Sequence, residues 1–174
     1  MKKVLYAILA LATLTLASCE KDPIGGTATE KMAGQWYVTL QHIDADGNVM
    51  YGGEDLFGVG QFMVLTFNTA ANDKDSLFVQ DYKGAFWDFK VRTACNLDDL
   101  TFGIKAGENL QYAPCNVDIT GGKILRGAAT TPSGAKADSI VFDIAFDDDP
   151  YPGAGYYDHH RITGYRYTGL AADE

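Results

Sequence analysis

Apolar and polar side chains alternate along most of the chain after residue 34. The clearest run is residues 140–146, in which every second residue is large and apolar and Asp143 lies on the other face. A period of two residues predicts a β-strand that buries one face. The same alternation occurs in residues 36–41, 87–92 and 100–104, and shorter β-prone runs occur at 60–68, 76–80, 110–119, 122–127 and 159–168.

Turn-forming residues separate these runs, among them Asp46-Gly47, Gly121-Gly122 and Pro132-Ser133-Gly134. No stretch of helical length repeats apolar residues at i, i+3, i+4 and i+7, so we expect no helical core. About nine short strands in one unit predict an all-β domain over residues 34–174, a single antiparallel β-barrel of about 8–10 strands, with a flat sandwich as the alternative. A barrel of this size holds one small ligand or is filled by its own side chains.

The N-terminus has a different pattern, in which Lys2 and Lys3 precede an uncharged, mostly apolar run that reaches Cys19. The run is shorter than the roughly 20 residues that a spanning helix needs, and it fits a signal peptide over residues 1–18. The segment Leu16-Ala17-Ser18-Cys19 resembles the bacterial lipobox, whose cysteine is lipidated and becomes the first mature residue. The resemblance implies a lipid anchor on Cys19; an ordinary secretory signal is the alternative.

Residues 19–33 mix Gly, Pro, Thr and charge without apolar periodicity, which predicts a flexible tether between the lipid and the barrel. The cluster Glu20-Lys21-Asp22 resembles the acidic export signals of Gram-negative surface lipoproteins. It implies a lipid anchor in the outer membrane, on its periplasmic or cell-surface face. Loss of residues 1–18 removes two lysines and moves the formal net charge from −9 to −11. Such an acidic domain repels phosphate backbones, which argues against nucleic acid as a partner.

Two cysteines, Cys95 and Cys115, remain once Cys19 carries the lipid. An even number of cysteines in an oxidising compartment favours a disulfide between them. Closing a loop of this length would stabilise the domain by about 3 kcal/mol in the chain-entropy model. Two buried free thiols are the alternative, because the spacing does not establish that the Cα atoms approach each other.

The triplet Gly34-Gln35-Trp36, at the start of the first predicted strand, resembles the Gly-x-Trp signature of lipocalins and related calycins. In that resemblance the tryptophan closes the floor of the barrel beneath a cationic side chain from the last strand. Arg161 and Arg166 are the candidates here, and the expected contact is a cation–π interaction. Gly34, Trp36 and Arg166 are therefore the predicted floor.

A second resemblance covers nearly the whole mature chain and rests on residues 121–129, 131–140, 147–150 and 163–169. These segments resemble a family of small bacterial lipoproteins known as lipid-binding putative hydrolases, whose members resemble lipocalin-like barrels. The resemblance implies a barrel that binds a lipid or a similar apolar ligand, without a hydrolase motif that transfers to these residues. We expect the inward faces of the central strands to line the pocket, through Met63, Leu65, Phe67, Trp87, Phe89, Phe102, Phe142 and Ile144.

Candidate catalytic groups form weaker patterns. The mature chain has three serines, Ser76, Ser133 and Ser139, none of them in a Gly-x-Ser-x-Gly turn. His42, His159 and His160 are the possible bases. The two adjacent histidines point to opposite faces of a strand, which disfavours a shared metal ion. We therefore assign no catalytic residue, metal ligand or cofactor.

The acidic segments offer two further alternatives. The run Asp44-x-Asp46-x-Asn48 lacks the glycine and the glutamate that a calcium loop requires, and Asp46-Gly47 fits a hairpin turn better. Three tyrosines, Tyr151, Tyr156 and Tyr157, lie beside the aspartates of residues 147–149. Exposed aromatic rings near carboxylates stack on sugars, so a surface glycan-binding accessory lipoprotein is one alternative function. A lipid or ester hydrolase, as the name of the resembling family suggests, is the other.

Overall fold

The computed structural model of the protein describes residues 25–150 and 159–173. The predicted signal peptide, Cys19 and the three tyrosines of residues 151–158 lie outside the described residues. Every strand and the whole described core lie between Thr29 and Asp173, so a chain beginning at Glu20 contains all the contacts described below. No helix within the described ranges has the length and apolar character needed to cross a membrane.

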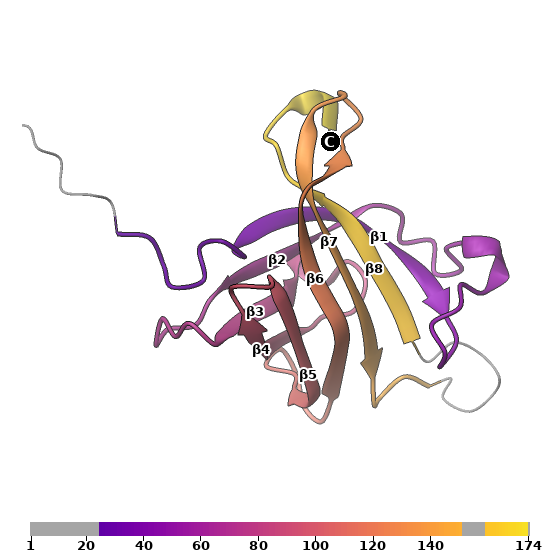
Figure 1. Ribbon diagram of the computed structural model, residues 1–174. Helices are drawn as coiled ribbons and strands as arrows, with labels where there is room; N and C mark the ends of the chain where they lie inside the picture. The colour runs from indigo at the N-terminus through magenta and orange to yellow at the C-terminus, as the bar shows by residue number, and fades with distance from the viewer. Residues whose placement is uncertain (1–24, 151–158, 174) are drawn as a thin grey trace, which may run out of the picture.

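Eight antiparallel strands form one closed barrel, in which each strand pairs with its neighbours in sequence and β8 pairs with β1 (Figure 1). The all-β barrel prediction is thereby confirmed. The strands are β1 (Gly34–Ile43), β2 (Phe62–Asn68), β3 (Ser76–Asp81), β4 (Lys90–Asn96), β5 (Thr101–Glu108), β6 (Asn116–Thr130), β7 (Lys136–Phe146) and β8 (His159–Arg166). Three short 3₁₀ turns complete the described elements: η2 (Tyr51–Gly53), η3 (Tyr82–Gly84) and η4 (Ala171–Asp173).

The structure has one strand where the sequence suggested two, at 110–119 and 122–127. β6 runs through Gly121-Gly122, and its pairing with β7 shifts register between Thr120 and Lys123. The two glycines make a bulge, not a turn: Gly121 has a φ of +62°, and a Cβ on Gly122 would collide with the carbonyl oxygen of Phe102. A bulge absorbs one extra residue and keeps the strand continuous, which turn-based reasoning does not anticipate.

Alternate residues of the strands point into the barrel, apart from the shift at the β6 bulge, and most of the inward residues are apolar. The buried members of this inward set are Trp36, Val38, Leu40 and His42 on β1, Phe62, Val64 and Thr66 on β2, Leu77, Val79 and Asp81 on β3, Val91 and Thr93 on β4, Phe102 on β5, Val117, Ile119 and Ile124 on β6, Ile140, Phe142, Ile144 and Phe146 on β7, and His160 and Ile162 on β8. Burial of these side chains is the main stabilising contribution to the fold.

Three residues predicted to point inward do not. Met63, Leu65 and Phe67 on β2 alternate with the buried Phe62, Val64 and Thr66, so they face outward. Leu65 and Phe67 line a shallow pocket of about 440 Å³ on the outer surface, together with Gly34, Gln35, Thr66 and Gln80. This corrects the predicted phase of β2: a register one residue out moves every side chain to the opposite face.

The predicted disulfide is wrong, because Cys95 and Cys115 are both free thiols. Cys95 on β4 pairs with Phe102 near the start of β5, whereas the carbonyl oxygen of Cys115 accepts a bond from Asn109 just beyond the end of β5. Seven residues of strand separate these positions, which corresponds to about 20 Å. A disulfide requires Cα atoms within about 7 Å, so the two thiols lie at opposite ends of the barrel and cannot pair.

The two ends of the barrel differ. At the closed end, where β1 begins and β8 ends, residues 27–33 fold over the barrel and bury Thr29 and Met32 completely. These residues belong to the segment expected to be a flexible tether, and that expectation is wrong for residues 27–33. The tip of the β6–β7 hairpin and the C-terminal segment project together at this end, where Ser133 N–H donates to Asp173 (Figure 1). We call the other end, where β1 ends and β8 begins, the open end.

Candidate functional site

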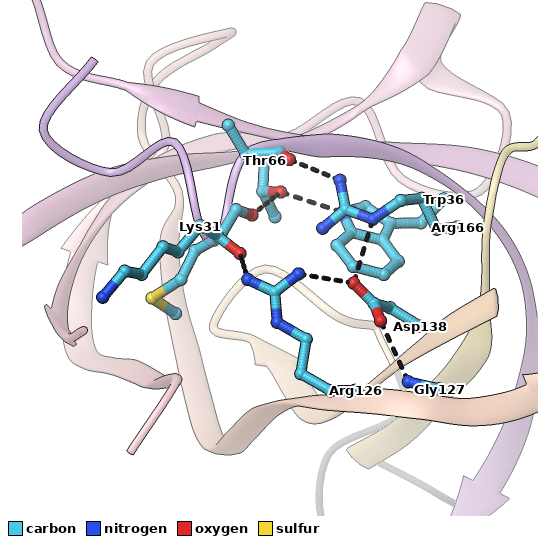
Figure 2. A network of polar contacts seen from close by, with 9 residues as sticks. Lys31, Trp36, Thr66, Arg126, Gly127, Asp138 and Arg166 are labelled. Carbon is cyan, nitrogen blue, oxygen red and sulfur yellow. Dashed lines mark hydrogen bonds and ion pairs between the residues drawn. The ribbon is translucent and has the colours of Figure 1, made fainter. Parts of the chain in front are cut away.

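The closed end is built around Trp36, on which the guanidinium of Arg166 lies 4.4 Å from the ring centre (Figure 2). The contact that the sequence suggested for Trp36 is therefore present with Arg166. The other candidate, Arg161, instead forms a two-point ion pair with Asp143, at 2.7 and 2.8 Å. Gly34 is needed beside the pair, because a Cβ there would collide with the Arg166 guanidinium.

A polar network ties the N-terminal segment to this floor (Figure 2). Arg166 donates to the carbonyl of Ala33 at 2.6 Å, and Arg126 donates to the carbonyl of Lys31 at 2.7 Å. Both guanidiniums face Asp138, at 3.4 and 2.8 Å. The pKa of Asp138 lies below its ordinary value because hydrogen bonding from Gly127 N–H and the charges of Arg126 and Arg166 outweigh its burial. These contacts seal the closed end against a ligand.

Side chains fill the middle of the barrel. Of the residues expected to line a pocket, Phe89, Phe102, Phe142 and Ile144 are buried. They pack into one core, in which the ring centres of Phe102 and Phe142 are 5.7 Å apart. Phe89 lies 5.6 Å from Phe146 in the same manner. These four residues are core side chains in this state, and whether any of the eight expected residues contacts a ligand stays a prediction.

The open end carries an aromatic cluster (Phe57, Phe62, Phe86, Trp87 and Phe146). Phe86 is its centre, with ring centres 5.7 Å from Phe62, 5.9 Å from Trp87 and 6.0 Å from Phe146. Trp87 stacks on Phe146 at 4.7 Å with the rings nearly parallel. Aromatic pairs in such arrangements add packing energy beyond simple area burial. These aromatic side chains, some buried and some partly exposed, cover this end of the barrel.

The loop that carries Phe86 and Trp87 is held by Asp81, which is fully buried at the end of β3. One carboxylate oxygen accepts the backbone N–H groups of Phe86 at 2.7 Å and of Trp87 at 2.9 Å. Burial raises the pKa of Asp81 above its ordinary value, although these hydrogen bonds oppose the shift. The carboxylate of Asp81 therefore positions Phe86 and Trp87 by accepting hydrogen bonds from their backbone N–H groups.

Two histidines lie beneath the aromatic cluster, and both are fully buried. His42 on β1 and His160 on β8 are paired in register, with their Nδ1 atoms 3.2 Å apart. Leu56 N–H donates to His42 Nε2, so the proton of neutral His42 lies on Nδ1 and points to His160. His160 then carries its own proton on Nε2, which faces Asp149 at 3.7 Å. Two hydrogen bonds therefore run in one direction, from the backbone of Leu56 to His42 and from His42 to His160, and the buried carboxylate of Asp149 lies 3.7 Å beyond His160.

The electrostatic state of this chain is set by burial. Desolvation lowers the pKa of His42 below its ordinary value, and the negative charges of Asp55 and Asp149 oppose the shift only in part. A further proton on His160 Nδ1 would face the N–H of His42 Nδ1, and a further proton on His42 Nε2 would face the N–H of Leu56, so protonation of either ring breaks one link of the chain. The neutral form of His42 is therefore the form that its buried surroundings favour.

A second polar chain lies beside the cluster and reaches the surface. Trp87 Nε1–H donates to the hydroxyl of Tyr112 at 2.9 Å, and that hydroxyl donates to Asp148 at 2.6 Å. Burial, followed by the bond to Asp148, raises the pKa of Tyr112 well above its ordinary value, so the phenol stays neutral. Cys115 lies 3.3 Å from the other oxygen of Asp148. Cys115, Asp147 and Asp148 are the one group of possible metal ligands among the described residues, but Asp147 already accepts two bonds from Asn116.

Exposed apolar side chains concentrate at this end. Of the nine large hydrophobic residues that are exposed within the described ranges, seven lie on the open-end loops, and we call them the apolar rim: Val49, Tyr51, Leu56, Phe57, Tyr82, Leu110 and Tyr112. Single exposed apolar residues are ordinary, whereas a set gathered on the loops of one end indicates a binding surface. The rim and the aromatic cluster together form the candidate site.

The structure does not bring the serines and histidines together. Ser133 lies in the hairpin tip at the closed end, where its hydroxyl contacts Thr131, while Ser139 bonds to the carbonyl of Gly164 and Ser76 to Arg92. His42 and His160 lie at the open end, and His159 faces an outer pocket beside Lys105 and Asp118. The suggested calcium loop is a turn in which Asp44 accepts the backbone N–H groups of Asp46 and Asn48.

Sequence reasoning missed the pairing of His42 with His160, although a signal was present. His42 continues the inward set Trp36, Val38 and Leu40 by strict alternation, so its phase alone places it inside the barrel. His160 has the same phase as Ile162 on β8. Their facing positions, however, depend on the β1–β8 register, which closes the barrel across more than 110 residues of sequence.

The comparisons with known proteins agree with this architecture. The model of one family, described as lipid-binding putative hydrolase, matches residues 21–171. No curated protein matches the chain. Because the match spans most of the sequence, the chain belongs to the lipid-binding putative hydrolase family.

Proposed function

We propose that this protein is a lipoprotein, held in the outer membrane by a lipid on Cys19, that binds a small apolar or amphipathic ligand, a lipid, at the open end of its barrel. The family and the barrel fold support the lipid. The lipobox-like segment and the acidic residues after Cys19 support the anchor and its location.

The observation that carries the proposed binding site is the apolar rim above the aromatic cluster. The closed end is sealed by the Arg166 and Arg126 network, and the middle is filled by core side chains. The open end is where apolar surface meets solvent and where loops, rather than paired strands, cover the barrel. Loops give way to a ligand at lower cost than the strands of a closed sheet.

The two tryptophans provide the test, because one lies at each end. Trp36 is buried in the floor, and Trp87 lies in the aromatic cluster at the open end. A variant Trp36→Phe leaves Trp87 as the sole indole, and Trp87→Phe leaves Trp36. We expect an amphiphile brominated near the end of its chain to quench Trp87 and to leave Trp36 unchanged, since bromine quenches only at short range.

Chain length gives an independent measurement. Each methylene that the site removes from water contributes about 0.8 kcal/mol, which corresponds to about a fourfold tighter Kd. Titrations with a homologous series should therefore show affinity rising with chain length until the chain exceeds the site. Quenching of neither tryptophan, together with no dependence on chain length, would count against lipid binding. Equal quenching of Trp36 and Trp87 would indicate that the ligand lies inside the barrel and not at its open end.

The anchor is tested separately. Metabolic labelling with a fatty acid should mark the wild-type chain and spare Cys19→Ala, and the wild type should fractionate with the outer membrane. Protease treatment of intact cells then distinguishes the cell surface from the periplasmic face. An unlabelled wild-type chain recovered from the soluble fraction would refute the anchor without bearing on the binding site.

A further inference from the structure

The charges around the open end indicate which head group the proposed site accepts, an inference that rests on the proposed function. The described loops of this end are residues 44–61, 82–89, 109–115 and 147–150. They contain eight acidic residues and one basic residue: Asp44, Asp46, Glu54, Asp55, Asp88, Asp147, Asp148 and Asp149, against Lys83. A low-dielectric opening lined by one sign of charge attracts ligands of the other sign.

These carboxylates lie among the rim residues rather than apart from them. Asp55 precedes Leu56 and Phe57 in the β1–β2 loop and holds that loop by accepting the N–H groups of Phe57 and Gly60. Asp88 follows Trp87 and accepts a bond from Gln111. An anionic head group bound at the rim would therefore meet several carboxylates and one lysine.

The single lysine already shows how the rim accommodates a cation. Its ammonium lies over the ring of Tyr82, 5.0 Å from the ring centre. The electron-rich face of an aromatic ring attracts a cation, and such faces beside a carboxylate are the usual means of binding alkylammonium groups.

A second tyrosine, Tyr112, offers a similar aromatic ring beside a carboxylate, and among the described residues no lysine ammonium is found over that ring. Tyr112 is 37% exposed, and its hydroxyl bridges Trp87 Nε1 and the carboxylate of the exposed Asp148. These bonds hold an indole and a carboxylate on either side of one phenol hydroxyl, at the edge of the aromatic cluster. We refer to Trp87, Tyr112 and Asp148 as the ammonium subsite.

We propose that the ligand is a cationic amphiphile, whose ammonium head binds at the ammonium subsite while its chain lies across the apolar rim. Tyr112 presents the ring face and Asp148 the countercharge. The hydrogen bond from Trp87 fixes the orientation of the phenol. The chain then runs over Phe86 and its neighbours, which supply apolar area without charge.

The test compares three amphiphiles with the same twelve-carbon chain: dodecyltrimethylammonium, monolauroylglycerol and laurate. Titration calorimetry on the chain from Glu20, below the micelle concentration and in EDTA, gives the three Kd values. We expect the ammonium compound to bind at least tenfold more tightly than laurate. In Asp148→Asn, which keeps the size of the side chain, that compound should bind about tenfold more weakly.

The matched control is Asp98→Asn in the β4–β5 turn at the closed end. It is also exposed and changes the net charge equally, so it should leave all three affinities unchanged. Monolauroylglycerol should bind wild type and Asp148→Asn alike. A second variant, Tyr112→Leu, should weaken ammonium binding as well, and thermal unfolding checks that each variant is folded.

The outcomes separate the two proposals. If laurate binds as tightly as the ammonium compound, or if Asp148→Asn changes nothing, the cationic head group is refuted while lipid binding stands. If equal losses follow from Asp98→Asn, the preference reflects net charge alone and the ammonium subsite is refuted. If none of the three compounds binds and Trp87 is not quenched, the proposed function itself fails.

Discussion

Replacing Gly34 with alanine tests whether the floor of the barrel is a stabilising unit. The added Cβ would overlap the Arg166 guanidinium, lie 3.1 Å from its central carbon and 3.4 Å from the Trp36 ring. The glycine itself cannot move, because it is the first residue of β1 and pairs with Thr66 on β2. The arginine is the flexible partner, so we expect the guanidinium to be displaced from Trp36.

The magnitude follows from the contacts that Arg166 would lose. Its charged hydrogen bond to the Ala33 carbonyl is worth roughly 1.5–3 kcal/mol. The cation–π contact with Trp36 adds roughly 0.5–2 kcal/mol. The ion pair with Asp138 is long and partly exposed, so its contribution to the free energy of unfolding is taken as zero. Allowing for partial retention, we expect a loss of about 2–4 kcal/mol, which lowers Tm by roughly 4–16 °C in a domain of this size.

Thermal and urea unfolding of the chain from Glu20 measure this loss. Gly25→Ala is the matched control, since no atom lies within 4 Å of a Cβ placed there. The decisive measurement is a double-mutant cycle with Arg166→Met. Because the methionine removes the overlapping guanidinium, Gly34→Ala should cost much less in that background. Additive losses, or a Gly34→Ala variant as stable as Gly25→Ala, would show that the floor geometry does not explain the glycine.

Two further predictions concern buried titratable groups. Burial lowers the pKa of His42, so this imidazole binds a proton less readily in the folded state than in the unfolded chain. The free energy of unfolding therefore contains a contribution from neutral His42 that is complete above a pH of about 6.5. That contribution is lost as the pH falls toward the pKa of His42 in the folded state. Chemical unfolding should show a decline in stability from pH 7 to pH 5 that is smaller in His42→Gln, and parallel profiles would contradict the assignment. Thiol titration of the unfolded, unreduced chain from Glu20 should count two free thiols. In the folded protein Cys95 should react before the more deeply buried Cys115. A disulfide in place of the two thiols would refute the conclusion that they lie at opposite ends of the barrel.

The barrel could be predicted because its signal is repeated in every strand. Residues 140–146 place an apolar side chain inward at each second position, and β7 realises that phase without exception. The barrel prediction depends on a pattern within short segments, and local sequence carries such patterns directly. The contact of Trp36 with Arg166 was predictable on a different ground, the resemblance of residues 34–36 to the Gly-x-Trp signature, which implies a cationic side chain from the last strand.

The phase of β2 could not be predicted, since Phe62-Met63-Val64-Leu65-Thr66-Phe67 is apolar at every position but one. Hydrophobicity alone favours Met63, Leu65 and Phe67 as the inward face, because the alternative set contains a threonine. The structure chooses the alternative because Thr66 is satisfied there: its hydroxyl accepts from Trp36 Nε1 at 2.8 Å and donates to the carbonyl of Met32 at 2.6 Å. A buried polar group with both bonds made costs little, and its partners lie 30 or more residues away.

The site at the open end could not be predicted either, because its polar residues also have partners that are distant in sequence. His42, Asp81, His160 and Asp149 are polar residues at buried positions, and each is explained by a partner from a different loop or strand. The disulfide prediction failed on a related point, since parity of count says nothing about which end of a strand each cysteine occupies. Sequence reasoning identified these residue types but could not place them, because placement depends on the register of strands that are distant in sequence.

The division between the two ends also bears on how the proposed anchor would orient the barrel. Thr29 and Met32 are buried in the closed end, so at most eight residue steps separate Cys19 from the first turn of the folded segment at Thr27. A fully extended chain of that length spans about 28 Å. β1 has ten residues, and with the tilt of a closed barrel it carries the open end roughly 25 Å further. The proposed tether of about 28 Å is slightly longer than the roughly 25 Å height of the barrel, so attachment at the closed end by itself lets the apolar rim face either the bilayer or the solvent.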